Sequence, residues 1–588
     1  MEYEITEERR RYLDARGYTI LMACPGSGKT TSIVYKLKQI TEELEALPDK
    51  GNGLLCLSFT NKACEEITNK YCEFHKKSLA YPHLVSTIDS FITQYIVMPF
   101  WYLCDFCQSK PRIINEKDLL RNFFYRGDYL PFQFKTFNEI ARSYPPEKIQ
   151  NDYSGYKIDR TCVNEYENEK LLNYCNAMTK YKLEHGILNS SDALWLACFI
   201  LKNNPLIAQT IANRFPYMII DEAQDTSNLQ FALFGILRDA GVKSMEFVGD
   251  INQSIYEWRN AKPDILDQYS KSEDWQGINF TKNRRSVQRI INLYSKLKPS
   301  NSPDIESYDV EDKMIPIIIY RYNVDMQKDV VNKFISKCVE FELNSKLILA
   351  RGKTKIKQLS AEKDPIRIWK SNLAYKVINA QIAYTNNRIR DAINEIKWVV
   401  AELKSKSADF IKVKNYLKDN EKDVNFNILL LDILSNLPAL SLSFSEWHNQ
   451  ITSLLENKLE LESKPDFQFK QRIAGHKIAE LKQAIVADYF GRNREKTIVA
   501  QTIHSVKGAS VDAVLLFLDQ NKTSGGISIK DIPADLIESN QIKEKHRLIY
   551  VACSRAKQFL ALAISSSIPK NDIRNIFGGL DIQIVDID

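Results

Sequence analysis

The chain has 588 residues, a formal net charge of +6 at neutral pH, 44% hydrophobic residues and 26% charged residues. This length exceeds a single compact core and predicts roughly three or four domains, while the composition is typical of a soluble globular protein. The mild positive charge permits an anionic partner without requiring one. No apolar run approaches the ~20 residues that span a bilayer, and the charged N-terminal segment excludes a signal peptide, so we expect a cytoplasmic protein without a membrane partner.

Residues 20–37 predict a phosphate-binding loop. An apolar strand pattern runs into ACPGSGKTTS (Ala23 to Ser32), and a helical pattern follows. The glycines let backbone N–H groups point at phosphates, Lys29 would reach the β- and γ-phosphates, and Thr30 would hold Mg²⁺ through its hydroxyl. The motif usually begins with glycine, which is alanine here. The predicted nucleotide-binding residues of this loop are Ala23, Gly26, Ser27, Gly28, Lys29, Thr30 and Thr31.

Cys104 and Cys107 in CDFC have the spacing of metal ligands. No second C-x-x-C occurs in the sequence, and its eleven cysteines are mostly set among apolar neighbours. We therefore favour reduced thiols over a disulfide framework, with a zinc site at the pair as the alternative.

The stretch FPYMIIDEAQDTSNLQ (Phe215 to Gln230) predicts a second nucleotide element. An apolar strand over residues 217–220 carries Asp221 and Glu222 to its carboxyl end, where parallel sheets collect their ligands. Asp221 is expected to hold Mg²⁺ through water, and Glu222 to orient and deprotonate the attacking water. The strand before this pair and the Gln-Asp-Thr after it make the pair specific, because most isolated Asp-Glu pairs are solvated surface.

DEAQDTSNLQ together with VGDINQSIYEWRNA (Val248 to Ala261) resembles the UvrD/Rep family of superfamily 1 helicases. Further motifs follow in the family's order and span nearly the whole chain. They are SFTNKACEEI (Ser58 to Ile67), STIDSF (Ser86 to Phe91), NRRS (Asn283 to Ser286), TIHSVKGASVDAVLL (Thr502 to Leu516) and RLIYVACSRAK (Arg547 to Lys557). The resemblance implies an α/β fold with two RecA-like P-loop lobes, each interrupted by a mainly helical insertion domain, and an ATP-dependent motor on nucleic acid.

The resemblance also implies how the two lobes share the chemistry. The phosphate loop and the carboxylates come from the first lobe, and Arg285 and Arg555 come from the second, where their guanidiniums would stabilise charge on the γ-phosphate. Gln253 is expected to sense the γ-phosphate and to link it to DNA. The predicted catalytic residues are Lys29, Glu222, Gln253, Arg285 and Arg555, with ATP and Mg²⁺ as cofactors and with Thr30 and Asp221 as the metal-binding residues.

A motor that steps along one strand must hold bases without reading them, which favours aromatic stacking. The residues at the family's DNA-contacting positions are Phe59, Asn61, Thr87, Tyr256, Trp258, Arg259 and His504. For Tyr256 and Trp258 the alternative is an aromatic core, and Asp89 replaces a histidine that the family often has. The expected substrates are single-stranded DNA and tailed duplex DNA.

Three positions depart from the family where it contacts the base and the sugar. Arg9 to Arg11 occupy the region of an adenine-reading glutamine, Arg284 replaces a stacking tyrosine, and Ser510 replaces a glutamate near the ribose. The phosphate contacts are kept. We therefore predict that hydrolysis survives with a weaker preference for ATP over other nucleotides.

The first lobe is expected to comprise residues 1–95 and 192–277, and the second lobe residues 278–364 and 491–588. The insertion at 96–191 is rich in aromatic residues and mostly helical in pattern, and the insertion at 365–490 has the spaced apolar residues of helices. Its lysines indicate a solvated helix face, with a duplex-binding track as the alternative. Because only a short stretch follows Arg555, we expect no appended nuclease domain.

The run TIDSFITQYIVMPF (Thr87 to Phe100) is similar to the helicase subunit of the Gabija anti-phage defence system. This similarity implies a nuclease partner of the OLD type with a TOPRIM domain, and a DNA repair or plasmid-borne helicase is the alternative. A different class also stays open, namely a DNA-end-sensing ATPase that activates a partner nuclease without unwinding. A polarity of 3′ to 5′ follows only from the family.

Overall fold

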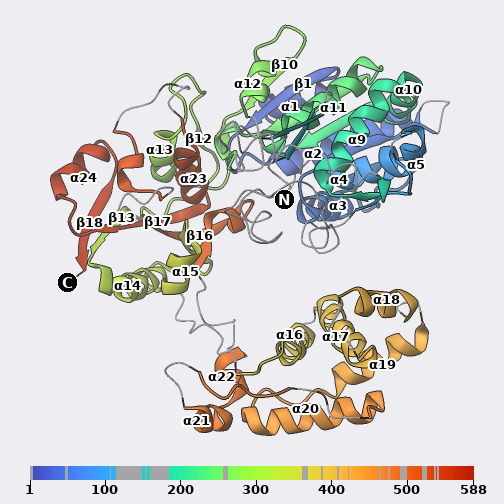
Figure 1. The fold of residues 1–588 in the computed structure, drawn as a ribbon. Helices are drawn as coiled ribbons and strands as arrows, with labels where there is room; N and C mark the ends of the chain where they lie inside the picture. Colours follow the sequence, from blue (N-terminus) through green and yellow to red (C-terminus); the bar gives the residue numbers. More distant parts are fainter. Residues whose placement is uncertain are drawn as a thin grey trace, which may run out of the picture. The chain divides into compact units, whose positions relative to one another are not determined.

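The structure is a computed structural model of the chain. It describes residues 4–46, 51–105, 107–113, 149–152, 155–158, 184–255, 263–359, 368–385, 388–406, 410–420, 423–462, 465, 467–473, 477–490, 500–518, 526–534, 538 and 542–587. The chain divides into two compact units, one comprising Met1–Lys353 and Gln501–Asp588 and the other Thr354–Ala500 (Figure 1). The second unit extends beyond both ends of the insertion predicted at 365–490.

A parallel sheet of six strands forms the first lobe, in the order β10-β1-β9-β8-β2-β3. β1, which leads into the phosphate loop, lies between β10 and β9. Because β10 pairs with β1 up to Phe280, the first sheet extends slightly past the boundary predicted at residue 278. The strands are β1 Tyr18–Ala23, β2 Leu54–Ser58, β3 Leu84–Thr87, β8 Tyr217–Asp221, β9 Ser244–Gly249 and β10 Gln276–Phe280.

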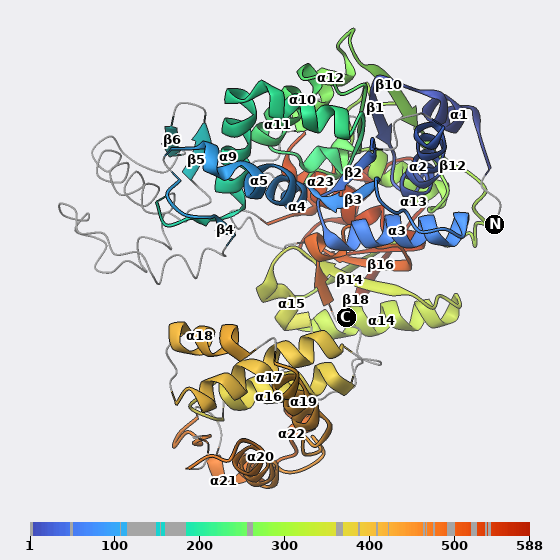
Figure 2. The ribbon, with the colours of Figure 1, turned by 90° about the vertical axis from the view of Figure 1, so that its right-hand side faces the viewer.

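Helices cover both faces of this sheet, because successive strand residues point to opposite sides. Ile20 and Ile220 belong to a core with α4, α9 and α11, whereas Leu21 and Ile219 belong to a core with α1, α2 and α3. Figure 2 shows the strands between these two groups of helices. The helices of the lobe are α1 Glu7–Asp14, α2 Lys29–Glu45, α3 Asn61–His75, α4 Ile88–Phe91, α9 Ser190–Asn203, α10 Pro205–Arg214, α11 Asn228–Asp239 and α12 Pro263–Ser270.

Capping boxes start the helices that return the chain to this lobe. Asp192 N–H donates to Asn189 Oδ1 and Asn189 N–H donates to Asp192 Oδ2, both at 2.8 Å, so the first donors of α9 are satisfied. The side chains of Ser227 and Gln230 make the same arrangement at the start of α11. This second helix follows directly on the Asp-Glu motif and therefore fixes the exit of the chain from it.

A second sheet has the order β15-β14-β16-β17-β13-β18, in which β14, β16, β17, β13 and β18 pair in parallel. Figure 1 shows α13 and α23 on one side of it and α14 on the other, where Phe334 stacks on Phe559 at 5.4 Å. The two parallel sheets confirm the predicted α/β fold class. The elements are β13 Ile317–Tyr322, β14 Lys346–Ala350, β15 Ala500–Thr502, β16 Val511–Phe517, β17 Ala556–Ser565, β18 Ile582–Ile587, α13 Gln288–Ser295, α14 Gln327–Glu340, α23 Glu544–Cys553 and α24 Lys570–Ile576. The helix α15 Lys353–Leu359 begins at the last residue of this part of the first unit and continues into the second unit.

The second unit is helical and has its own hydrophobic core. Trp369 and Trp447 are fully buried there, with ring centroids 5.4 Å apart. Its helices are α16 Leu373–Thr385, α17 Ile389–Lys404, α18 Phe410–Asn420, α19 Val424–Ser435, α20 Phe444–Leu459, α21 Ile478–Gln483 and α22 Val486–Phe490. The spaced apolar residues of the sequence form the inner faces of these helices.

Most of the insertion predicted at 96–191 lies outside the described residues. Its described part includes α5 Met98–Phe100 and a parallel pair, β4 Arg112–Ile113 with β7 Ile187–Leu188. It also contains an antiparallel pair, β5 Ile149–Asp152 with β6 Gly155–Ile158. The domain boundaries at this insertion stay predictions.

Lys36, on the helix α2 that follows the phosphate loop, is a buried cation. Its Nζ lies 2.7 Å from Glu246 Oε1 on β9 and donates to the Tyr12 carbonyl at 2.7 Å. Burial lowers the pKa of Lys36 in spite of the nearby carboxylate. Replacing Lys36 with Met leaves the Glu246 carboxylate unpaired in the core, so we expect the free energy of unfolding of this lobe to fall by about 3–5 kcal/mol.

Urea unfolding of the variants measures this loss. Lys38→Met is the matched control on the same helix, because Lys38 forms an exposed pair with Glu42 and its loss is expected to cost about 0.5 kcal/mol. The double variant Lys36→Met/Glu246→Leu should recover most of the loss, since apolar replacement of a whole buried pair is often neutral. Equal effects of Lys36→Met and Lys38→Met would contradict a structural role for the pair.

Candidate functional site

The phosphate loop connects β1 to α2, and its backbone conformation requires glycine at two positions. Gly26 and Gly28 have φ values of 74° and 86°, which glycine adopts without strain. A Cβ at Gly26 would lie 2.5 Å from Arg285 Cβ, and one at Gly28 would lie 2.5 Å from Arg9 Nη2. This tight backbone turn fits a phosphate cradle. Of the other predicted loop residues, Ala23 ends β1, the Ser27 hydroxyl donates to the Cys24 carbonyl, and Thr30 and Thr31 lie in the first turn of α2.

Two carboxylates at the end of β8 meet the lysine of this loop. Lys29 Nζ lies 2.6 Å from Glu222 Oε1 and 3.4 Å from Asp221 Oδ1. The other oxygen of Glu222 accepts a hydrogen bond from Gln224 Nε2 at 2.5 Å. Glu222 itself has a φ of 56°, a conformation that turns the chain sharply after the buried strand. The structure therefore brings Lys29, Asp221 and Glu222 together as the sequence predicted.

These contacts set the charge of each group. Burial raises the pKa of Asp221. Burial also raises the pKa of Glu222, but Lys29 and then Lys507 outweigh it and lower that pKa below its ordinary value. Burial lowers the pKa of Lys29, and the two carboxylates more than reverse this. A general base works best with a pKa near the working pH, so Glu222 becomes a better base when Lys29 moves away from it.

The carboxylate of Asp221 fits a bound Mg²⁺. Its Oδ1 is buried, and the ammonium of Lys29 lies 3.4 Å away from it. Mg²⁺ prefers oxygen ligands and is usually held by one or two carboxylates together with phosphates and water. A buried carboxylate oxygen beside the phosphate loop is such a ligand.

A hydrogen-bonded chain joins the first sheet to α23 of the second lobe. Arg555 Nη2 donates to Gln253 Oε1 at 2.9 Å, and Gln253 Nε2 donates to Asp250 Oδ2 at 2.9 Å. The Tyr550 hydroxyl donates to the same Asp250 oxygen at 3.3 Å. Arg555 is fully buried, and burial followed by the charge of Arg285 lowers its pKa to about 9. Gln253 and Arg555, predicted separately from two motifs, are in direct contact.

Arg285 lies against the phosphate loop. Its Cβ is the atom that excludes a side chain at Gly26, and its Nη1 donates to the Ser554 carbonyl at 3.2 Å. Burial lowers the pKa of Arg285. Arg285 therefore contacts the residue that directly precedes Arg555, so the two predicted arginines lie close together in the second lobe.

A cation of the second lobe that the sequence prediction missed also contacts the carboxylates. Lys507 Nζ pairs closely with Asp225 and lies 3.6 Å from Glu222 Oε2. Burial raises the pKa of Asp225 to about 6, even though the charge of Lys507 beside it acts to lower that pKa. Both residues stand inside quoted motifs, QDT and HSVKG, which is the signal that could have found them.

Comparison with known proteins gives the family. The UvrD/REP helicase N-terminal domain matches residues 5–274, and the UvrD-like helicase C-terminal domain matches residues 477–567. The chain belongs to the UvrD/Rep-type superfamily 1 DNA helicases. The two matches include every residue of the site described above except Arg285.

Its relatives include three named helicases. The chain is 24% identical to a probable DNA helicase II homolog of Mycoplasma genitalium, over 95% of this chain and 84% of that protein. It is 22% identical to the ATP-dependent DNA helicase PcrA of Staphylococcus aureus, over 96% and 83%. It is 23% identical to the ATP-dependent DNA helicase Rep of Buchnera aphidicola, over 65% and 58%. These findings support the UvrD/Rep resemblance and do not support the finer one to a Gabija subunit.

The candidate DNA-contacting residues of this family member are only partly described. Tyr256, Trp258 and Arg259 lie outside the described residues. Phe59 directly follows β2 and Thr87 ends β3, so both lie at the same edge of the first sheet, because Ser58 pairs with Thr87. The remaining two are Asn61, exposed at the start of α3, and His504, half-buried in the second lobe with a pKa that burial lowers. Their roles on DNA stay predictions.

Cys104 and Cys107 are buried free thiols in the core of the first lobe. Among the residues that the structure describes, no group of three or more His, Cys, Asp or Glu side chains is placed to hold a metal ion. The described part of the chain therefore offers the zinc alternative no further ligands.

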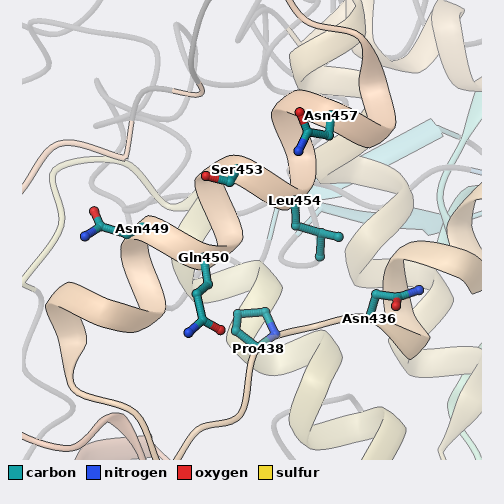
Figure 3. A pocket seen from close by; sticks show the side chains of 7 residues that line it. All are labelled: Asn436, Pro438, Asn449, Gln450, Ser453, Leu454 and Asn457. Atoms are coloured by element: carbon teal, nitrogen blue, oxygen red, sulfur yellow. The ribbon is translucent and has the colours of Figure 1, made fainter.

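A shallow groove of the second unit is separate from this chemistry. Figure 3 shows amide and hydroxyl side chains of α20, with Asn436 and Pro438 from the segment after α19. The groove contains none of the predicted site residues.

Within the described ranges no helix is long and apolar enough to cross a membrane.

Proposed function

We propose that this chain couples ATP hydrolysis to movement along single-stranded DNA and unwinds tailed duplexes, with a polarity of 3′ to 5′. The observation that carries the proposal is the hydrogen bond between Arg555 and Gln253. It links the second lobe to the loop that follows β9, while Lys29 and Glu222 lie on the first lobe. Family membership supports DNA as the track.

The residues of the phosphate loop, Lys29 and Thr30 would hold ATP and Mg²⁺, with Asp221 as the carboxylate on the metal side. When bound there, Mg²⁺ would neutralise part of the charge on the phosphates. Lys29 must turn from Glu222 to the phosphates, since its Nζ is now 2.6 Å from that carboxylate. This movement removes the cation that most lowers the pKa of Glu222, so the carboxylate can accept a proton from the attacking water.

Arg285 and Arg555 would then stabilise the charge that develops on the γ-phosphate. Arg285 lies against the phosphate loop through its Cβ, and the Arg555 guanidinium donates to Gln253. Both come from the lobe that must close on the nucleotide. The Asp250 backbone N–H and the Ser254 hydroxyl both donate to Gln224, a neighbour of Glu222. The segment from Asp250 to Ile255 therefore responds to changes at the carboxylates and leads directly into the candidate DNA residues that begin at Tyr256.

ATP hydrolysis with and without single-stranded DNA tests the proposal, alongside unwinding of 3′-tailed and 5′-tailed duplexes. We expect the strand to stimulate hydrolysis and only the 3′-tailed duplex to separate. Glu222→Gln, which removes the base, should lower the rate by at least about 10²-fold and stop unwinding. A hydrolysis rate that does not respond to DNA would refute a DNA-driven motor.

A stimulated rate with both duplexes intact would instead favour the DNA-end-sensing ATPase. A place in anti-phage defence beside an OLD/TOPRIM-type nuclease stays a sequence-based hypothesis, as does a role in DNA repair, because the relatives described above are named only as helicases.

A further inference from the structure

Lys507 connects the second lobe with the acidic segment that follows β8 in the first lobe. It stands directly after the short turn of residues 503–506, and its Nζ pairs closely with Asp225. The same Nζ lies 3.6 Å from Glu222 Oε2. One cation of the second lobe therefore bridges two acidic side chains of the first lobe, one of which is the expected base of the reaction.

Asp225 depends on this contact for the compensation of its charge. It is 3% exposed, and its Oδ1 has no hydrogen-bond partner among the residues that the structure describes. A buried carboxylate is unfavourable unless a cation or hydrogen bonds compensate for its lost hydration. Withdrawal of Lys507 would leave Asp225 buried without that cation, so the ion pair favours the arrangement in which the turn meets the first lobe.

The turn before Lys507 is compact and anchored in the second lobe. Ile503 and Val506 are buried in the core of that lobe. The Ser505 N–H donates to Thr502 Oγ1 at 3.3 Å, and the Ser505 hydroxyl donates to the Thr502 carbonyl at 2.8 Å. Because these contacts hold the turn together, a ligand that shifts the turn also shifts the backbone of Lys507.

The same segment also contacts groups that are expected to meet DNA and the γ-phosphate. His504, a candidate DNA residue within the turn, hydrogen-bonds to the backbone of Ile255, which directly precedes further candidate DNA residues. Two residues after Lys507, the Ala509 carbonyl accepts from Arg555 Nη1 at 3.4 Å. DNA bound at His504 would therefore act on a segment that already contacts the carboxylates and the catalytic arginine.

We propose that Lys507 is a positioning residue that, through its ion pair with Asp225, transmits DNA binding at the turn to the position of Glu222. This inference rests on the proposed function and adds the route by which the strand accelerates hydrolysis. DNA at the turn and nucleotide at the phosphate loop both bias this ion pair, so each changes the affinity of the protein for the other.

The first test measures a stimulation factor, which is the kcat of ATP hydrolysis with saturating single-stranded DNA divided by the kcat without DNA. Lys507→Met keeps the length of the side chain and removes its charge, so we expect the factor to fall by about tenfold. Asp225→Asn should lower the factor similarly, and Lys507→Arg, which keeps the charge, should recover most of it. Because partial unfolding lowers both rates alike, the factor reports coupling and not stability.

Lys570→Met is the matched control for the loss of a lysine. It breaks a partly exposed pair with Asp586 in the same lobe and should leave the stimulation factor unchanged. A wild type that responds to DNA, with the same factor in Lys507→Met and Asp225→Asn, would overturn the inference and leave the proposed function standing.

Binding of single-stranded DNA with and without a non-hydrolysable ATP analogue, adenylyl imidodiphosphate, gives a second readout. We expect the analogue to change the Kd for DNA in the wild type and in Lys507→Arg, but not in Lys507→Met. This result supports the inference even if DNA fails to stimulate hydrolysis, which is the outcome that refutes the proposed motor. An equal change of Kd in the wild type and Lys507→Met would overturn the inference. A wild type in which neither hydrolysis responds to DNA nor DNA binding responds to the analogue would refute both proposals.

Discussion

Replacing Lys29 with Met is expected to lower the kcat of DNA-stimulated nucleotide hydrolysis by about 10²–10³-fold. The side chain has two tasks in the structure. It supplies the buried positive charge at the phosphate loop, and it pairs with Glu222 at 2.6 Å and with Asp221 at 3.4 Å. Met keeps the length of the side chain and removes the charge, so the loss reports the charge alone.

The pH dependence of the remaining hydrolysis rate distinguishes the role of Lys29 at the phosphate loop from its pairing with the two carboxylates. Lys29 is the strongest influence lowering the pKa of Glu222, and Lys507 is the next. A base is active while ionised, so activity falls as the pH drops through its pKa. Without Lys29 this pKa rises in the nucleotide-free enzyme, so the acid limb of the kcat/KM profile, which reports that state, should move to higher pH. Lys38→Met, on an exposed turn of the same helix, is the control and should leave both rate and profile unchanged.

An unchanged acid limb in Lys29→Met would show that Glu222 is not the titrating base. An unchanged kcat would show that the loop does not act on the phosphates.

Local pattern was sufficient for the first-lobe elements of the site. The run before Lys29 and the run before Asp221 are continuous apolar strands, as expected for parallel strands covered on both faces. Each strand leads into a motif whose combination of residue types is rare outside nucleotide-binding sites. Because carboxyl ends of parallel strands share one edge of a sheet, the meeting of Lys29 with Glu222 could be predicted from the order of the residues alone.

Contacts between distant segments could not be predicted in the same way. Glu4 meets Tyr308, and Lys507 meets Asp225, across hundreds of intervening residues. Taken alone, each is an ordinary charged or aromatic residue. The strand ending at Phe280 shows the same limit, because the boundary predicted at residue 278 cuts through it and assigns its last residues to the second lobe, whereas the whole strand pairs with β1 of the first sheet.

Replacing Arg555 with Ala is expected to lower the kcat of hydrolysis by about 10³-fold, the loss typical of a residue that stabilises transferring phosphate. Arg555 is fully buried, and its Nε donates to the Val551 carbonyl while its Nη2 donates to Gln253. With a pKa near 9 it remains charged at neutral pH. Lys557→Ala removes a more exposed cation two residues later and is the matched control, which should keep nearly full activity.

The contact with Gln253 provides a more specific test of Arg555 than the fall in kcat alone. Gln253→Ala should reduce the stimulation by single-stranded DNA more than the basal rate, because Gln253 connects Arg555 with Asp250 and the segment that leads to the DNA residues. Since the two side chains act through one hydrogen bond, their effects should not add, and the double variant should resemble Arg555→Ala.

Nucleotide binding and thermal unfolding, measured on the same proteins, separate a loss of catalysis from a loss of folded structure. Additive losses in the double variant, or equal losses in Arg555→Ala and Lys557→Ala, would contradict a coupled pair, because an isolated structural arginine has no reason to share its effect with Gln253.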